Sequence, residues 1–442
     1  MQIHAHDVKD EGVEVVLRNM QKAGVNAILP CANYVYELMN SPGPEILPHN
    51  PKRKRYYTLG GTYFESHLEY YENTKIKPAR TPEKDVKDFD VLAEVCSIAK
   101  KLDMEVYPWI SCFKHPIDAR NHPDCLVEDV YGRKSINYMW GKYIADWFCP
   151  NNPHAKNFSL AMIEDIVRSY DIAGVFVDRF RYPVNLGVCF CPYCQKRMKE
   201  KGLSPNILRC TVKEVLRKEN ETQFKKIVNF GTSTDLLYLF SKFPELLNWI
   251  TFRMNSITNF IKDVYNLVKG INPNLKVGLD MINPAGAWFL GQNPYQLSDY
   301  CDWVKPMAYN KAQGNWIGAE ISELSKSLSE EKDSSEIYKA FKAIYQVRGI
   351  KLPHTFEEFK KEGMPSSWVY DEAKITKELV GEKTLIHLGI QIWPPATTDD
   401  VKDSITKAFE ANIDGIIMYC YGWAPLKNFA AAKDSLKRLG KL

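Results

Sequence analysis

The chain has 442 residues, of which 45% are hydrophobic and 25% are charged, a composition typical of a folded globular protein. The formal net charge is +4, with both signs interspersed and no basic block that contains aromatic residues, so nucleic acid is not an expected partner. No window approaches about 18 consecutive apolar residues, the length that a membrane-spanning helix needs.

The N-terminus and the cysteines bear on the cellular compartment. Residues 1–7 contain neither the basic stretch nor the apolar segment of a secretory signal. The eleven cysteines are an odd number in a long chain, which favours reduced thiols over a disulfide framework. These features predict a cytoplasmic protein, and a leader removed from the natural chain is the alternative left open.

Strand-like and helix-like patterns alternate along the chain. Short apolar runs predict eight strands, at residues 3–6, 26–30, 105–111, 173–178, 276–281, 303–309, 385–393 and 415–421. Apolar residues at helical spacing predict helices between them, at residues 12–23, 89–102, 155–170, 244–270 and 398–411. Three long excursions interrupt the alternation, at about 34–86, 184–245 and 311–383.

Eight strand–helix units predict an α/β fold, a (β/α)8 TIM barrel with long βα-loop insertions, rather than an open sheet. We expect a single barrel domain over residues 1–442, in which the first strand pairs with the last. The excursion at 311–383 is rich in Lys, Glu and Ser and reads as several helices. It is therefore predicted to be a helical insertion that serves as a lid or a small lobe.

The segment from Ala173 to Pro183 carries the strongest indication of a functional site. A near-continuous apolar run ends in Asp178, Arg179 and Arg181, and such a run is typical of a parallel strand buried between helices. Charged residues at the carboxyl end of that strand lie where α/β barrels place their active sites. A carboxylate there is costly unless it is paired or used, so Asp178 is the first candidate for chemistry.

Five segments form a set of motifs. They are the strand that ends in Asp178 with the Arg-Tyr-Pro that follows, and residues 149–153, 189–194, 302–309 and 389–393. Together they resemble a glycoside-hydrolase-like (β/α)8 barrel family of the TIM-barrel superfamily, and the resemblance covers nearly the whole chain. It implies a glycosyl hydrolase that acts on a carbohydrate or glycoside ligand at the C-terminal face of the barrel.

Glycoside hydrolysis needs two carboxyl groups beside the scissile bond. Asp178 on the fourth expected strand and Asp280 on the fifth provide such a pair, whereas no carboxylate ends the sixth or the seventh strand. We expect Asp178, kept ionised by Arg179 or Arg181, to be the nucleophile or charge stabiliser and Asp280 to be the acid/base. This arrangement resembles that of α-amylases, but it has Asp in place of Glu on strand five and no Asp on strand seven.

The other polar and aromatic residues at the expected strand ends are predicted to bind the substrate. They are His4, His6, Asp7, Asn33, Trp109, Arg179, Arg181, Tyr309, Gln391, Trp393 and Tyr421. Asp7 and Glu65 are also spare candidates for the second carboxyl. Structural roles are the alternative: an ion pair of Asp178 that locks the barrel mouth, capping or Arg pairing by Asp280, and aromatic rings that belong to the core.

The motif Cys189-x-Cys191-x-x-Cys194 places three thiols at a spacing typical of metal ligands. A structural zinc takes four ligands. Cys149 begins the helix that leads down to strand four, so it lies on the same barrel face as Cys189 and is the expected fourth ligand. Three residues rank behind it: His154, Cys125 and Cys210. Reduced thiols that pack a loop are the alternative.

Two other functions stay open. His4-x-His6 resembles the metal-binding pair of amidohydrolase barrels and would indicate a metal-dependent hydrolase. Strands five and six offer no histidine to complete such a ligand set, so we expect this pair to bind substrate or to be structural. The non-enzyme alternative is a carbohydrate-binding barrel that has lost one carboxylate. In the leading interpretation catalysis requires no cofactor.

Overall fold

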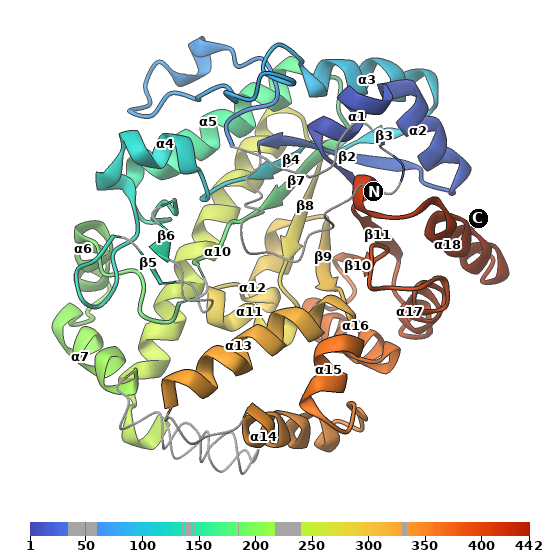
Figure 1. Cartoon of the computed structure of the whole chain (residues 1–442). Coiled ribbons are helices and arrows are strands. Elements are labelled where there is room, and N and C mark those ends of the chain that lie inside the picture. Colours follow the sequence, from blue (N-terminus) through green and yellow to red (C-terminus); the bar gives the residue numbers. More distant parts are fainter. Residues whose placement is uncertain are drawn as a thin grey trace.

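The structure is a computed structural model of the chain, and it describes residues 1–33, 49, 60–134, 136–137, 143–144, 146–183, 185–216, 240–328 and 334–442. In Figure 1 the strands lie at the centre of the molecule and helices surround them. The strands are mostly parallel and form a nearly closed barrel, which confirms the predicted TIM-barrel fold.

The barrel has eight strand positions in chain order, and β3 is an additional short strand that pairs with β2. The order is β1 (Gln2–Ile3), β2 (Ala27–Asn33), β4 (Trp109–Ser111), β7 (Gly174–Asp178), β8 (Lys276–Met281), β9 (Trp303–Ala308), β10 (Leu385–Gln391) and β11 (Gly415–Tyr419). The remaining strands are β3 (Glu105–Val106) and an antiparallel pair, β5 (Ile136–Asn137) and β6 (Tyr143–Ile144).

The first and last strands meet at a seam, defined here as the contact of β1 with β11. Among the described residues no backbone ladder joins the two strands. Side chains that flank the two strands are in contact instead: Nδ1 of His4, which follows β1, lies 3.4 Å from Sγ of Cys420, which follows β11. Beside them, the Asn19 amide donates to the Tyr421 hydroxyl at 3.1 Å. The expected strand pairing is thus replaced by side-chain contacts.

Helices cover the outside of the barrel. Those that follow or connect its strands are α2 (Val13–Lys22), α3 (Val91–Lys101), α5 (Pro153–Ser169), α10 (Glu245–Ile271), α16 (Ser366–Val380), α17 (Thr398–Glu410) and α18 (Leu426–Arg438). Local sequence sets their beginnings: Asn152 caps α5 by accepting from two backbone N–H groups, and Thr397 forms a capping box with Asp400 in α17. No helix in the described ranges is long and apolar enough to cross a membrane.

Further helices lie in the connections. They are α1 (Ala5–Glu11), α4 (Pro116–Asn121), α6 (Pro192–Glu200), α7 (Pro205–Val215), α11 (Pro284–Ala287) and α12 (Pro294–Leu297). Single 3-10 turns occur at Leu68–Tyr71, Pro123–Cys125, Trp288–Leu290, Ser298–Tyr300 and Tyr421–Trp423.

The predicted first strand is too long by three residues. The strand ends at Ile3 because His4 is the N-cap of α1, and the backbone N–H of His4 donates to the Asp7 carboxylate at 2.9 Å. His6 and Asp7 therefore lie on a helix, and the expectation that they end a strand is wrong. The predicted strand at 105–111 is also divided into β3 and β4, with a proline, which lacks a backbone N–H, between them.

The excursion at 311–383 forms the helices α13 (Ala312–Leu328), α14 (Ser334–Val347), α15 (Phe356–Glu362) and then α16. The first three pack on one another, while α16 packs against α17 and β9 and so serves as a barrel helix. The helical character of this segment was predicted from its sequence. A function as a lid or a small lobe stays a prediction.

An aromatic layer fills the barrel on the amino-terminal side of Asp178. Trp303 stacks on Phe176 at a centroid distance of 5.3 Å and contacts the rings of Tyr107 and His387 at 5.7 and 5.3 Å. Gly278, between Phe176 and Trp303 in the sheet register, leaves space for the indole. A Cβ atom on Gly278 would lie 2.0 Å from Trp303 Cζ2. The barrel interior below the aspartates is therefore close-packed.

We predict that Gly278→Ala lowers the free energy of unfolding by at least about 2 kcal/mol, because the added methyl group overpacks the Trp303 layer. Gly270→Ala is the matched control: a methyl group added at this position, near the end of α10, would have no neighbour within 4 Å. That variant should gain up to about 1 kcal/mol from helix propensity. Denaturant unfolding of both variants measures the difference, and equal stabilities would contradict the described packing.

Candidate active site

Two carboxyl groups lie on neighbouring strands of the barrel. Asp178 is the last residue of β7, and Asp280 is the penultimate residue of β8. Val177 is opposite Leu279, so the next position along each strand is one of the two aspartates. Both side chains are buried, and the charge of Asp178 helps to raise the pKa of Asp280. The two carboxyl groups are therefore close enough to interact electrostatically.

Hydrogen-bond donors face both carboxylate oxygens of Asp178. The indole Nε1–H of Trp109 on β4 donates to Oδ2 at 2.9 Å, and the backbone N–H of Arg179 donates to Oδ1 at 2.5 Å. The Arg179 Nε atom lies 3.8 Å from Oδ2. Donors and positive charge directed at a carboxylate stabilise its ionised form. The surroundings of Asp178 are thus suited to a charged carboxylate.

The chain leaves β7 through a left-handed turn. Arg179 has a φ angle of 52°, a conformation that residues other than glycine adopt infrequently. The turn directs the N–H of Arg179 back to the carboxylate of the residue before it. Such conformations cluster at functional sites, which agrees with the position of this turn at the carboxyl end of the strand.

A buried cation contacts Asp280. Lys305 is opposite Asp280 in the β8–β9 register, and its Nζ donates to Asp280 Oδ1 at 2.9 Å and to the Tyr309 hydroxyl. Burial raises the pKa of Asp280 to about 7 against the opposing effect of Lys305, with Asp178 raising it further and Arg181 lowering it. Desolvation outweighs the ion pair because both side chains are shielded from water. Asp280 can therefore hold and release a proton near neutral pH.

Aromatic rings adjoin both aspartates. Trp109 contacts Asp178 directly, and the Lys305 ammonium group lies 4.9 Å from the centroid of the Tyr309 ring. Further rings continue from these two with centroid distances between 5.0 and 5.9 Å: Tyr309 to Trp393, Trp393 to Tyr419, Tyr419 to Trp423 and Trp109 to Tyr419. The set forms a buried cluster of rings, packed edge-on against one another, next to the two carboxyl groups.

The two histidines of the His4-x-His6 motif face different partners. His4 lies beside Cys420, and its pKa is held well below the usual range by burial, so the ring is neutral. His6 Nε2 lies 2.6 Å from Glu83 Oε2. His4, Asp7 and Cys420 have ligand atoms within 4.8 Å of one another, but this group excludes His6. The described residues therefore do not assemble the metal pair of the amidohydrolase-like alternative.

Two predicted ligand residues use their amides to hold backbone. Asn33 donates to the carbonyl of Ser111 at 2.8 Å and accepts from its N–H at 2.9 Å, where the β2–β4 register shifts. Gln391 accepts from the N–H of Ala312 at 2.8 Å and donates to the carbonyl of Trp393 at 3.1 Å. Both side chains thereby fix strand ends around the site, and their contact with a sugar stays a prediction.

Tyr421 and Glu65 are not brought together with the aspartates. The Tyr421 hydroxyl donates to Glu11 at 2.9 Å and accepts from Asn19, so it faces the helices α1 and α2. Glu65 has an exposed side chain. Arg181 lies with its guanidinium 5.3 Å from the Trp147 ring and acts on Asp280 through its charge.

Two residues of this group, Lys305 and Tyr419, lie at expected strand ends but are not among the site residues predicted from the sequence. Lys305 is the one charged residue in an otherwise apolar strand, and strand alternation places it on the same face as Trp303. Tyr419 is opposite Gln391 in the β10–β11 register, so it shares the inward face of that residue. Both lie in the carboxyl-terminal part of the expected strand segments, but the sequence alone assigns a role to neither.

Solved structures share this fold across nearly the whole chain. The glycoside hydrolase domain of PgaB (BpsB) from Bordetella bronchiseptica has a TM-score of 0.55 and 12% sequence identity, with 99% of this chain and 97% of that chain covered. The β-galactosidase from Halorubrum lacusprofundi has a TM-score of 0.55 and 12% identity, with 100% and 58% covered. At these identities the similarity defines the TIM-barrel fold.

Sequence comparison identifies the family. The sequence profile of the family described as Glycosyl hydrolase-like 10 matches residues 58–313, more than half of the chain, and the chain belongs to this family. The glycosyl hydrolase YngK of Bacillus subtilis is 28% identical over 153 residues, which are 33% of this chain and 29% of that protein. The match therefore spans less than a third of the length of this curated relative.

We predict that Asp280 makes the folded protein less stable as the pH rises from 3.8 to about 7, since its pKa is raised from 3.8 to about 7 on folding. In this interval the unfolded chain releases the proton and the folded protein retains it, so deprotonation favours unfolding. The melting temperature of the wild type relative to Asp280→Asn should fall across this interval.

Asp171→Asn, at an exposed ion pair with Lys100, is the control and should follow the wild-type curve. The opposite result is a melting temperature of the wild type that rises relative to that of Asp280→Asn as the pH increases. It would show that Lys305 keeps Asp280 ionised throughout this interval.

Proposed function

We propose that this protein hydrolyses a glycosidic bond, with Asp178 as nucleophile or charge stabiliser and Asp280 as the acid/base. The observation that carries the proposal is the unlike environment of two neighbouring carboxyl groups. Asp178 faces donors and an arginine, whereas burial raises the pKa of Asp280 to about 7. Two carboxyl groups whose environments separate their protonation states are what this reaction requires.

The contacts support the following roles. Asp280 gives its proton to the oxygen of the leaving group as the glycosidic bond breaks, and the carboxylate of Asp178 stabilises the positive charge that develops on the sugar. A water molecule then supplies the new oxygen at that carbon and returns its proton to Asp280. Lys305, 2.9 Å from Asp280 Oδ1, stabilises Asp280 while it is deprotonated and orients it.

Substrate binding is assigned to the neighbouring rings. Carbohydrates present apolar C–H faces as well as hydroxyl groups, and the set that includes Tyr309, Trp393 and Trp423 supplies aromatic faces for them. Membership in a glycosyl hydrolase-like family and the fold shared with glycoside hydrolases support this class of ligand. The alternative is a barrel that binds carbohydrate and does not hydrolyse it, and the following experiments distinguish the two.

We predict that Asp178→Asn lowers turnover of aryl glycosides by several orders of magnitude, because the amide lacks the negative charge that stabilises the transition state. The melting temperature of this variant is measured as well, because both oxygens of Asp178 accept from N–H donors in the wild type. In the variant one of these donors would face the NH2 group of Asn, which cannot accept. Asp171→Asn is the control and should retain full turnover.

The variant Asp178→Ala provides a second measurement, which would show no effect if Asp178 had only a structural role. Azide or formate, as small anions, should restore part of its activity by replacing the missing carboxylate. A folded Asp178→Asn variant with wild-type turnover would refute the assignment. Binding of glycosides by a wild-type protein that hydrolyses none of the aryl glycosides offered would establish the non-catalytic barrel.

We predict that the rate falls as the pH rises above about 7, because the general acid must be protonated. Lys305→Met removes the charge that lowers the pKa of Asp280, so this decline should move to higher pH. Lys269→Met is the matched control, because it breaks an ion pair with Asp302, which lies just before the amino end of β9. The pH dependence of the rate should not change in this variant.

Asp280→Asn should lower the rate of hydrolysis far more for glycosides with poor leaving groups than for those whose leaving groups are acidic phenols, because the phenols need no protonation. An equal loss on both substrate types, or an unchanged pH profile in Lys305→Met, would remove Asp280 from the acid role.

A further inference from the structure

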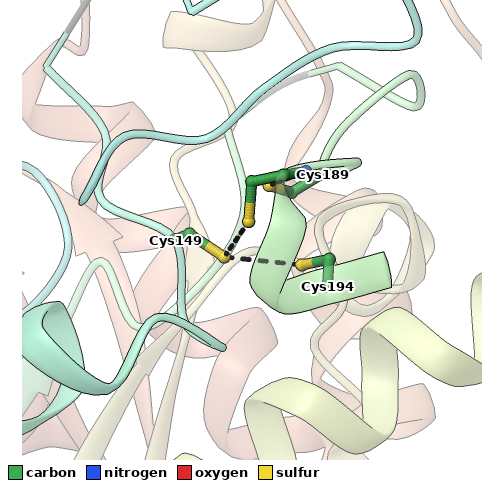
Figure 2. A group of neighbouring side chains, drawn as sticks. Cys149, Cys189 and Cys194 are labelled. Carbon is green, nitrogen blue, oxygen red and sulfur yellow. Dashed lines mark hydrogen bonds between the residues drawn. The ribbon is translucent and has the colours of Figure 1, made fainter. Parts of the chain in front are cut away.

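Four cysteine sulfurs converge beside the barrel. Cys149 precedes α5, Cys189 and Cys191 lie in the connection that follows β7, and Cys194 is in α6. Their sulfur atoms all lie within 4.8 Å of one another, and all four side chains are buried. Figure 2 shows the sulfur of Cys149 directed towards that of Cys194, with Cys189 beside them. All eleven cysteines of the chain are free, so no disulfide accounts for the convergence.

The sulfur separations fit a tetrahedral metal centre. Zinc–sulfur bonds of about 2.3 Å place the sulfurs of a tetrahedral site roughly 3.8 Å apart. Cys149 Sγ lies 3.4 Å from Cys194 Sγ and 3.5 Å from Cys191 Sγ. The spacing Cys-x-Cys-x-x-Cys brings three ligands together locally, and the fourth comes from about 40 residues earlier in the chain. Packing of thiols in a loop requires no such convergence of a distant fourth sulfur.

Hydrogen-bond donors are directed at the sulfurs. The backbone N–H groups of Glu128 and Cys191 donate to Cys189 Sγ at 3.3 and 3.5 Å. The side-chain amide of Asn151 donates to Cys194 Sγ at 3.3 Å and to the Ser256 hydroxyl at 2.9 Å. N–H donors around sulfur stabilise thiolates and are the outer contacts that metal sites use to orient their ligands.

A buried arginine supplies a second, independent indication. The Arg253 side chain on α10 is fully buried and forms no ion pair with any described residue. Its guanidinium donates to two backbone carbonyls and stacks 4.7 Å from the Tyr182 ring. Burial lowers the pKa of Arg253 to about 10, and negative charge on Tyr182, Cys189 and Cys194 would oppose this effect. A buried cation is costly without a nearby negative charge, and four thiolates around one divalent metal carry a net charge of −2.

We propose that Cys149, Cys189, Cys191 and Cys194 bind one zinc ion as a closed structural site. Each thiol loses its proton on binding, the four sulfurs occupy all positions of a tetrahedral zinc, and no electron is transferred. The site has no open position for substrate or water, so it is separate from the chemistry assigned to Asp178.

The position of this cysteine site in the chain gives it a function. It ties the beginning of α5 to the connection between β7 and α6, the segment that begins with Arg179 and contains Arg181. Trp147, which contacts the Arg181 guanidinium, lies two residues before Cys149. Zinc therefore links the segment that carries the arginines to the residues around Trp147 that contact it. Removal of zinc makes that segment less rigid and leaves the catalytic groups in the protein.

The test is metal analysis of the purified chain by mass spectrometry. We expect about one zinc per chain in the wild type and in Cys210→Ala, whose exposed thiol lies outside the cluster, and a loss of most of it in Cys191→Ala. Chelation of the wild type should lower the melting temperature by several degrees, and added zinc should restore it.

Protein produced with cobalt in place of zinc gives a readout that does not depend on folding of a variant. Four thiolates should produce intense sulfur-to-cobalt charge-transfer absorption together with the visible bands of tetrahedral cobalt. Metal-free protein with an unchanged melting temperature, iron as the bound metal, or a cobalt spectrum without thiolate bands would each overturn the proposal.

Discussion

The buried contact between Lys305 and Asp280 sets the electrostatics of the barrel mouth. Neither side chain reaches water, so burial raises the pKa of Asp280, while Lys305 lowers it and Asp178 raises it further. The apolar layer around Trp303 lies below this contact and excludes solvent from that side. A carboxyl group in such a place keeps its proton to higher pH than one on the surface, as the raised pKa of Asp280 shows.

The fold could be predicted because parallel strands buried on both faces leave a clear pattern. The run before Asp178 is apolar on both faces, and the predicted runs that end at Asp178 and Met281 match β7 and β8 to within a residue. The first strand was less clear, since the residues after Ile3 can extend a strand or begin a helix. The hydrogen bond from His4 N–H to Asp7 decides for the helix, and it depends on a side chain three residues ahead.

The site could be predicted in part, because a sequence reveals local patterns but not the register between distant strands. Asp178 and Asp280 stand out as charges that end apolar strands. Lys305 acquires its meaning only from the register that places it opposite Asp280, and no local pattern encodes register between strands that are far apart in the chain. The choice between Tyr419 and Tyr421 likewise depends on where β11 ends, because the chain turns at Cys420 and sends the second tyrosine towards α1 and α2.

The seam between β1 and β11 has a mechanical consequence. Every other neighbouring pair of barrel strands is held by backbone hydrogen bonds, whereas the described part of this one is held by the contacts of His4 with Tyr419, Cys420 and Trp423. Tyr419 and Trp423 also belong to the aromatic set beside the aspartates. The packing of His4 at the seam therefore also positions two rings of the aromatic set, so a substitution of His4 would disturb the seam and these rings together.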